Sequence, residues 1–238
     1  MTSREPGSDA GIIGLILAGG TGRRLGGVRK GDLRLGNVSL LAHVIGALQQ
    51  HCATILLSVG AGPETHYEDV LSLPDAPDGV TGPAAGLLAG ARWCTRNLPG
   101  GLMVSASVDT PFLPADFVPR ALDLLEADSD CVVAAYGGRD YPTNALWRAD
   151  HLLAHLDAIP PAPRGPRLRD VQMALGSVHL DYSAIAAANP FAGINRLTDL
   201  LALDSRLRRT ADKWWKENGS PGRIRTSDQP VNSRLLYH

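Results

Sequence analysis

Short apolar runs alternate with mixed apolar and polar segments along most of the chain. Four mainly apolar runs have the length and composition of strands buried on both faces: Ile12–Leu17, Thr54–Val59, Leu102–Val108 and Cys131–Tyr136. The segments between them are predicted to contain helices, over residues 39–48, 83–92 and 114–126. Strands that alternate with helices predict an α/β fold with a mostly parallel central sheet and helices on both faces.

Two of the predicted helices begin with recognisable signals. Ser39 can accept a hydrogen bond from a free N–H of the first turn, and apolar residues follow it at helical spacing as far as Leu48. Pro83 follows Gly82 at a first helical position, where the missing N–H of proline is tolerated.

The two ends of the chain differ in composition from the region between them. Residues 1–10 are polar and are expected to be disordered, and residues 11–209 form one predicted domain. Residues 210–238 show no periodic apolar face, and we interpret them as a disordered tail or the product of an extended reading frame. A proline-rich loop over residues 160–166 leads to a basic helix start at Arg167. This loop is either a surface linker or a lid whose arginines bind an anionic second substrate.

Composition narrows the class of protein. A chain of 238 residues with 44% apolar residues can bury one full core, and a net charge of −1 gives no sign of nucleic-acid or membrane binding. No apolar run approaches the roughly 18 residues of a membrane span, and the run from residue 12 to 18 lacks the flanks of a signal peptide. Cys52, Cys94 and Cys131 are isolated in the sequence, which predicts reduced thiols in a cytoplasmic protein and no structural zinc site.

A glycine-rich loop follows the first predicted strand, at residues 17–31 (LAGGTGRRLGGVRKG). Glycines let the backbone approach a ligand closely, and free N–H groups can cradle phosphate oxygens. Arg23, Arg24 and Lys30 add positive charge, so a triphosphate site is the leading interpretation. The spacing fits neither a dinucleotide-binding loop nor a P-loop. The alternative is a tight strand-to-helix turn with solvated arginines.

Three further polar residues fall near this loop or at predicted strand and helix ends. Asp109 ends the third predicted strand, where it can hold Mg²⁺ beside the phosphates or cap the next helix. Asp75 can orient a nucleoside or serve as a turn residue, and Asn195 can be a second oxygen ligand or a turn residue. Because ligands bind at the carboxyl ends of parallel strands, we expect Asp109 and the glycine-rich loop to meet.

Hydrolase motifs are missing from the sequence. It has neither the G-x-S-x-G of a serine nucleophile nor the H-E-x-x-H of a zinc protease. Phosphoryl-type transfer needs mainly positioning and charge neutralisation. A phosphate monoester acceptor, with a second pKa of about 6, is already an anionic nucleophile and requires no general base.

Taken together, the motifs resemble those of the molybdenum cofactor guanylyltransferases, the MobA family of the nucleotidyltransferase superfamily. The resemblance spans about residues 11–205 and rests on five segments in the family's order: residues 17–31, 82–86 (GPAAG), 109–112 (DTPF), 141–143 (YPT) and the segment around Asn195. It implies a single-domain, Rossmann-like nucleotidyltransferase fold. It also implies Mg²⁺-dependent transfer of GMP from GTP to molybdopterin, with release of pyrophosphate.

The resemblance also implies roles for particular residues. Those that would contact the nucleotide are Leu17, Ala18, Gly19, Gly20, Lys30, Ser58, Asp75 and Asp109. Those that would carry the reaction are Arg24, Lys30 and Asp109, with Asp109 and Asn195 as metal ligands. Tyr141, Pro142 and Arg167 would form the pterin side. Molybdopterin-loading proteins and molybdoenzyme chaperones are the protein partners that such a role suggests.

Three residues depart from the family pattern. Arg29 stands where Asp usually precedes the lysine, and Ser58 stands where Asn usually ends the second strand. Tyr141 replaces the His of a common His-Pro pair. The first two bear on nucleotide binding and the third on the identity of the acceptor.

Two other functions stay open at this point. One is cytidylyl or other nucleotidyl transfer to a small phosphorylated acceptor, because the loop alone does not reveal the base. The other is a catalytically silent module that binds nucleotide or pterin, against which Lys30 and Asp109 argue. A dinucleotide-dependent oxidoreductase is disfavoured by the loop spacing.

Overall fold

A computed structural model describes most of the predicted domain. It covers residues 11–19, 29–60, 67, 70–75, 80–125, 129–160, 162 and 164–205. The expectations for residues 1–10 and 210–238, and those for Gly20 and Arg24, lie outside these described residues. Within them, no helix is long and apolar enough to cross a membrane.

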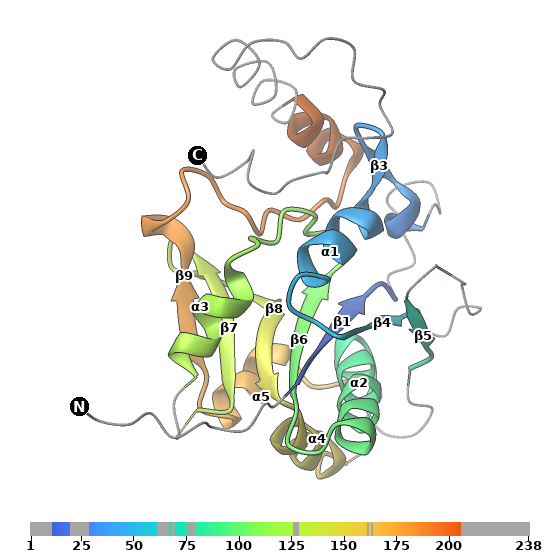
Figure 1. Cartoon of the computed structure of the whole chain (residues 1–238), viewed down its shortest axis with the longest axis vertical. Helices are drawn as coiled ribbons and strands as arrows, with labels where there is room; N and C mark the ends of the chain where they lie inside the picture. Colours follow the sequence, from blue (N-terminus) through green and yellow to red (C-terminus); the bar gives the residue numbers. More distant parts are fainter. Residues whose placement is uncertain are drawn as a thin grey trace.

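The centre of the molecule is a seven-stranded sheet in the order β5-β4-β1-β6-β8-β7-β9 (Figure 1). Its strands are β1 (Ile12–Leu17), β4 (Thr54–Ser58), β5 (Leu71–Leu73), β6 (Leu102–Ser107), β7 (Cys131–Tyr136), β8 (Arg139–Arg148) and β9 (Val178–Asp181). Both neighbours of β8 run antiparallel to it, and the other paired strands are parallel. The predicted mostly parallel sheet is confirmed.

Helices cover both faces of this sheet, as predicted. They are α1 (Leu40–Leu48), α2 (Pro83–Asn97), α3 (Phe117–Leu124), α4 (Ala149–Asp157) and α5 (Leu168–Ala174). Alternate residues of each buried strand face opposite layers. Ile16 packs with α1 and α3, whereas Leu15 packs with α2, α4 and α5. Apolar runs without polar alternation are therefore what this sheet requires.

Several predicted boundaries differ from the structure by a few residues. β4 ends at Ser58 and β6 at Ser107, each one residue early, because the chain turns there into loops. α2 continues to Asn97, since buried Cys94 extends its apolar face. α3 begins only at Phe117, after a turn that includes Asp116. The Ser39 N-cap is confirmed, with its hydroxyl 3.1 Å from the amide nitrogen of Ala42.

Some elements of the sheet and its covering layers were missed by the sequence analysis. They include β5, β8, α4 and β9. β8 follows a turn in which Gly137 and Gly138 have positive φ, and its first half is only partly buried. That half lacks the apolar run by which the other central strands were recognised.

A third, smaller apolar cluster lies beyond the carboxyl ends of β1 and β6. It joins Leu35, Leu40, Phe112, Ile194 and Leu203, all buried. Leu35 belongs to a hairpin of β2 (Arg34–Leu35) and β3 (Val38–Ser39), and Leu203 to helical residues 197–205 above it (Figure 1). The amide of Gly36 also donates to Asp204, at 3.0 Å. The cluster therefore fastens the last described helix to the hairpin.

Candidate functional site

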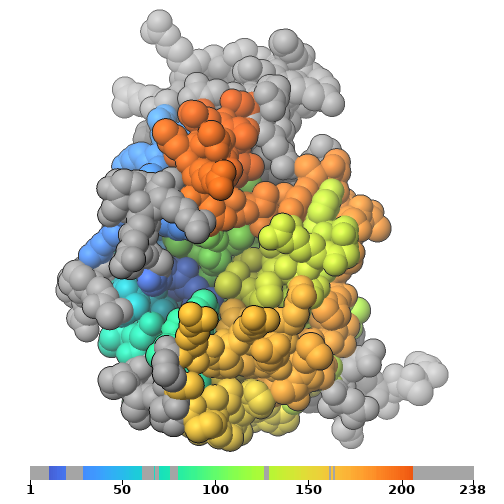
Figure 2. Space-filling view, turned by 180° about the vertical axis from the view of Figure 1, so that it is seen from behind, coloured from blue at the N-terminus to red at the C-terminus, as the bar shows by residue number. Residues whose placement is uncertain are grey.

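A cleft of about 340 Å³ opens at the carboxyl ends of β1, β4 and β6 and at the start of α2. It is lined by Leu17, Gly19, Lys30, Ser58, Asp75, Gly82, Pro83, Ser107, Val108, Asp109 and Thr143. Figure 2 shows the molecule from behind. In this view, blue and green atoms lie between the orange segment that ends at residue 205 and the gold segment around residue 165. Asp109 and the described ends of the glycine-rich loop meet here, as predicted.

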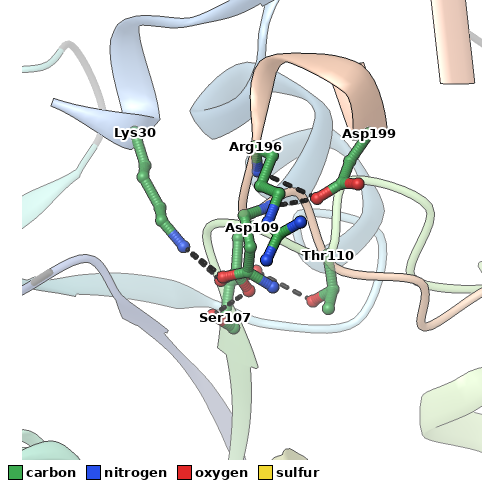
Figure 3. Close-up of polar contacts among 7 residues, drawn as sticks. Lys30, Ser107, Asp109, Thr110, Arg196 and Asp199 are labelled. Carbon is green, nitrogen blue, oxygen red and sulfur yellow. Dashed lines mark hydrogen bonds and ion pairs between the residues drawn. The ribbon is translucent and has the colours of Figure 1, made fainter. Parts of the chain in front are cut away.

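Lys30 connects two oxygen ligands from distant parts of the sequence. Its Nζ donates to Asp109 Oδ2 at 2.8 Å (Figure 3). It also donates to Asn195 Oδ1 at 3.0 Å. The side chains of Lys30 and Asp109 are only 18% and 22% exposed, so the ion pair is partly shielded from water. A carboxylate and an amide oxygen thus already converge on one cation.

The Asp109 side chain is held by its own loop. Ser107 Oγ donates to Asp109 Oδ1 at 2.6 Å, and the amide of Thr110 donates to the Ser107 carbonyl at 3.0 Å. The Asp109 carbonyl accepts from the amide of Ile194 at 2.9 Å. This last bond ties the loop after β6 to the segment that carries Asn195.

Asp199 fixes that segment from the other side. Its Oδ2 accepts from the backbone amides of Asn195 and Arg196, at 2.9 and 2.8 Å (Figure 3). These two bonds lower the pKa of Asp199, so it stays ionised at neutral pH. The sequence analysis missed Asp199, although an Asp four residues after Asn195 at a helix start is a usable signal.

A second polar pair, Ser58 and Asp75, also lines the cleft. Ser58 Oγ donates to Asp75 Oδ1 at 2.8 Å. Gly86 of α2 packs directly against it, since a Cβ there would lie 2.5 Å from Ser58 Oγ. The structure brings Asp75 into the cleft with the glycine-rich loop.

The described part of the glycine-rich loop turns tightly over the end of β4. The amide of Ala18 donates to the Ser58 carbonyl at 2.9 Å. Gly19 lies against Gly60, and a Cβ on Gly19 would be 3.2 Å from the Gly60 Cα. Gly60 also has φ +68°, a conformation that other residues rarely adopt. Both positions therefore require glycine where the backbones of residues 19 and 60 meet.

The residues assigned to the pterin side lie just beyond Thr143. The Tyr141 ring packs on Phe191, with centroids 5.3 Å apart, and its hydroxyl accepts from Asn189 Nδ2. Gln172 Nε2 donates to the Pro142 carbonyl at 2.8 Å. Neither Tyr141 nor Pro142 is among the residues that line the cleft; Thr143 is the one of this motif that does.

Arg167 is exposed and precedes the first residue of α5. Two residues earlier, Gly165 abuts the backbone of Thr81, where a Cβ would lie 1.9 Å from the carbonyl oxygen. In Figure 2 the gold residues around 165 accordingly border the teal start of α2. The proline-rich loop therefore touches Thr81, the neighbour of Gly82, which lines the cleft.

Magnesium fits this donor set. Mg²⁺ prefers oxygen ligands, and Asp109 and Asn195 both present oxygens to the Lys30 ammonium. Neither here nor elsewhere in the described residues does a group of three or more His, Cys, Asp or Glu side chains that could hold a metal ion occur. A bound Mg²⁺ would take its remaining ligands from phosphate and water.

The three cysteines have no part in this chemistry. They are free thiols, with Cys94 and Cys131 buried and Cys52 half-buried. Burial raises the pKa of Cys52 to about 12 and that of Cys94 to about 11. Neither is a thiolate at neutral pH, which leaves both as core residues.

Comparison with known proteins agrees with this site. The MobA-like NTP transferase domain matches residues 14–178. A protein of Mesorhizobium japonicum named molybdenum cofactor guanylyltransferase is 34% identical over 206 residues, which cover 82% of this chain and 95% of that one. A protein of the same name from Rhizobium leguminosarum bv. trifolii is 36% identical over 194 residues, covering 79% and 90%.

Solved structures show the same fold at lower identity. Molybdopterin-guanine dinucleotide biosynthesis protein A from Archaeoglobus fulgidus has a TM-score of 0.59 at 21% identity, covering 83% of this chain and 99% of that one. A 4-diphosphocytidyl-2C-methyl-D-erythritol synthase has a TM-score of 0.60 at 13% identity, covering 84% and 100%. With its fold, its cleft and its relatives in agreement, the chain belongs to the MobA-like NTP transferase family and is a nucleotidyltransferase.

Proposed function

We propose that this protein transfers GMP from GTP to molybdopterin and releases pyrophosphate. One observation carries the proposal: Lys30, which also contacts Asn195, pairs with Asp109 in the same cleft that the Ser58–Asp75 pair lines. A phosphate-neutralising end and a nucleoside-binding end thus share one cavity. Relatives about 35% identical over most of this chain bear the name molybdenum cofactor guanylyltransferase.

The nucleoside would lie between the described glycine-rich loop and the Ser58–Asp75 pair. Leu17 and Gly19 line the cleft on either side of Ala18, and the backbone of this segment would bind the base and ribose. Gly20 would also contact the nucleotide, and Arg24 would take part in the reaction. Asp75, held by Ser58 at 2.8 Å, is placed to accept hydrogen bonds from a sugar or base.

The reaction needs little proton transfer. The terminal phosphate of molybdopterin is already anionic at neutral pH, since a phosphate monoester has a second pKa of about 6. One of its oxygens forms a bond to the α-phosphorus of GTP, and the bond from that phosphorus to the bridging oxygen breaks. The electron pair leaves with pyrophosphate. Lys30 neutralises charge that develops on the phosphates, so positioning supplies most of the catalysis.

Asp109 and Asn195 would hold Mg²⁺ in this reaction. The ion would supply charge neutralisation on the phosphate oxygens. The Lys30 ammonium, which now contacts both oxygens, would then turn to the phosphates. Asp109 would keep its bond from Ser107 in either state.

The acceptor would enter past Thr143, next to Tyr141, Pro142 and Arg167. An exposed arginine at this rim suits an anionic acceptor. Tyr141 is held between Phe191 and the Arg139 guanidinium, which lies 5.6 Å from the ring centroid. Molybdopterin-loading proteins or molybdoenzyme chaperones would be the protein partners of this step.

Incubation with molybdopterin and each of GTP, CTP and ATP, with and without Mg²⁺, tests the proposal. We expect pyrophosphate release and a guanine dinucleotide product only with GTP and Mg²⁺. A cytosine product would keep the reaction and change the nucleotide. Nucleotide binding without pyrophosphate release would identify a silent module and refute the proposal. Thermal stabilisation by each nucleotide, measured in parallel, separates binding from turnover.

A further inference from the structure

A buried asparagine connects the loop of Asp109 to the neighbouring strand. β6 and β8 are paired from Leu102↔Arg148 to Ser105↔Ala145, and the ladder goes no further. At the next position, Asn144 Oδ1 accepts from the Ser107 amide at 3.4 Å and from Thr110 Oγ1 at 2.9 Å. Its side chain therefore replaces the backbone partner where the two strands separate to open the cleft.

Thr110 completes the connection. Its hydroxyl lies 2.9 Å from the Ser107 carbonyl as well as 2.9 Å from Asn144 Oδ1, and it is only 4% exposed. Between Ser107 and Thr110 stands Asp109, whose carboxylate accepts from Ser107 Oγ at 2.6 Å. Figure 3 shows Ser107, Asp109 and Thr110 grouped in this way. Both ends of the Asp109 turn are thus bonded to Asn144.

Asn144 cannot itself touch a substrate, because it is 0% exposed. It lies on the same strand face as Leu146, which packs in the layer of α1 and α3, whereas Thr143 on the other face lines the cleft. Any effect of Asn144 on the reaction must therefore pass through the turn that carries Asp109.

Packing alone does not explain an asparagine here. Its Nδ2 is buried and has no hydrogen-bond partner among the described residues. An unpaired buried donor is destabilising, and an apolar side chain of similar size would avoid that penalty. The feature that an apolar residue would lose is the acceptor oxygen, which serves Ser107 and Thr110.

We propose that Asn144, acting with the Thr110 hydroxyl, is a positioning residue that fixes the orientation of the Asp109 carboxylate. Small misplacements of a catalytic group lower the rate strongly while binding of the remote nucleoside changes little. The Asn144–Thr110 pair should thus affect kcat more than the KM for GTP. The kinetic part of this inference rests on the guanylyl transfer proposed above.

Asn144→Leu and Thr110→Val test it, since each removes a polar group and keeps the approximate size. We expect each to lower kcat about tenfold, with the KM for GTP within about twofold of the unchanged protein. Thr110→Ser retains the hydroxyl and should restore most of kcat. The double variant should be hardly slower than either single one, because both act on one network.

Amide hydrogen exchange gives a readout that does not depend on turnover. The Ser107 and Thr110 amides should exchange faster in Asn144→Leu than in the unchanged protein. Thr95→Val is the matched control, because Thr95 Oγ1 is also buried without a partner among the described residues but lies near the far end of α2. It should change neither kcat nor exchange at residues 107–110.

The proposal is overturned if Asn144→Leu keeps kcat within twofold, or if exchange at Ser107 and Thr110 is unchanged. It is also overturned if Thr110→Ser is as slow as Thr110→Val. Should the unchanged protein prove inactive with GTP and molybdopterin, the proposed function fails on its own. The exchange measurement would then still decide whether Asn144 holds the Asp109 turn.

Discussion

Asp109 combines two tasks that a single substitution can separate. Its Oδ1 accepts from Ser107, and its Oδ2 pairs with the Lys30 ammonium. Asp109→Asn keeps the shape and an oxygen toward Ser107 but removes the charge. We expect kcat to fall by about a hundredfold or more, because an oriented charge at the reacting phosphates is lost. Pyrophosphate release measures it, and circular dichroism should show an unchanged fold.

Asp157→Asn is the matched control for that experiment. Asp157 also forms an ion pair, with Arg92 at 2.8 Å, but it lies in α4. This helix follows the last residue of β8, which pairs with the first residue of β6, so it lies away from the cleft. Exposed pairs of this kind contribute little to stability, so both kcat and Tm should be nearly unchanged. A kcat for Asp109→Asn within threefold of the Asp157→Asn value would remove Asp109 from the reaction.

Among the elements, α2 borders the proposed nucleoside contacts through a glycine. Gly86 faces Ser58 so closely that a methyl group would displace its hydroxyl from Asp75. Gly86→Ala should raise the KM for GTP several-fold even though alanine favours helices by roughly 1 kcal/mol. Steady-state kinetics and thermal unfolding measure the two effects.

Gly46→Ala provides the comparison within another helix. Gly46 lies inside α1, and a Cβ there meets nothing within 4 Å. This variant should be stabilised by up to about 1 kcal/mol with no change in KM. If Gly86→Ala behaved in the same way, the close contact with Ser58 would not matter for nucleotide binding.

The third apolar cluster, which includes Leu203 of helical residues 197–205, gives a separate prediction. Leu203 packs with Phe112 and Ile194, which adjoin the segments of Asp109 and Asn195. Leu203→Ala should lower kcat. It should also lower the free energy of unfolding, by no more than the roughly 2–5 kcal/mol typical of a buried leucine replaced by alanine. Because the cluster is local, kcat should fall by more than the loss of global stability, measured as the change in Tm, would account for.

Leu201 tests whether that effect is specific. It belongs to the same helical stretch but is 59% exposed. Leu201→Ala should leave both Tm and kcat close to those of the unchanged protein. Equal losses in the two variants would mean that the helix as a whole, and not the buried cluster, supports the site.

For the whole molecule, His43 links stability to pH. Burial lowers the pKa of His43 below its ordinary value of 6.5, and the ring packs edge-on against Phe112. The unfolded chain therefore binds the proton first as the pH falls through about 6.5, which favours unfolding. The free energy of unfolding should fall from about pH 7 toward pH 5, and less steeply in His43→Gln. Urea titrations at each pH measure both slopes, and parallel slopes would contradict the assignment.

The sequence was informative about the whole molecule wherever apolar residues form continuous runs. β1 and β7 were predicted with their observed bounds, since strands buried on both faces admit few polar residues. β8 escaped prediction because its first five residues are not fully buried and its partners are set by long-range pairing. Local pattern carries no information about which distant strand will supply a neighbour.

The site shows the same division. Glycine spacing and the Asp109 motif are local patterns, and they are enough to predict where the cleft lies. Asn144 was not found, because its bonds to Ser107 and Thr110 exist only where the fold brings β8 beside β6. Asp199 could be predicted only in part. Its place at a helix start is a local signal, and it bonds to the Asn195 and Arg196 amides. Those bonds matter for the site because Asn195 contacts Lys30, which only the fold brings about.

The packing of Leu203, in the last described helix, against Phe112 and Ile194 has a consequence for how the protein folds during its synthesis. Lys30 and Asp109 are synthesised before Asn195 and Leu203, which follow the last strand of the sheet. A ribosome-bound chain that has emerged only as far as β9 can build the sheet, yet lacks one of the two oxygens that face Lys30. Given the proposed role of Asn195, the reaction requires residues made after the last strand, and a chain that stops at β9 would fold much of its core without becoming an enzyme.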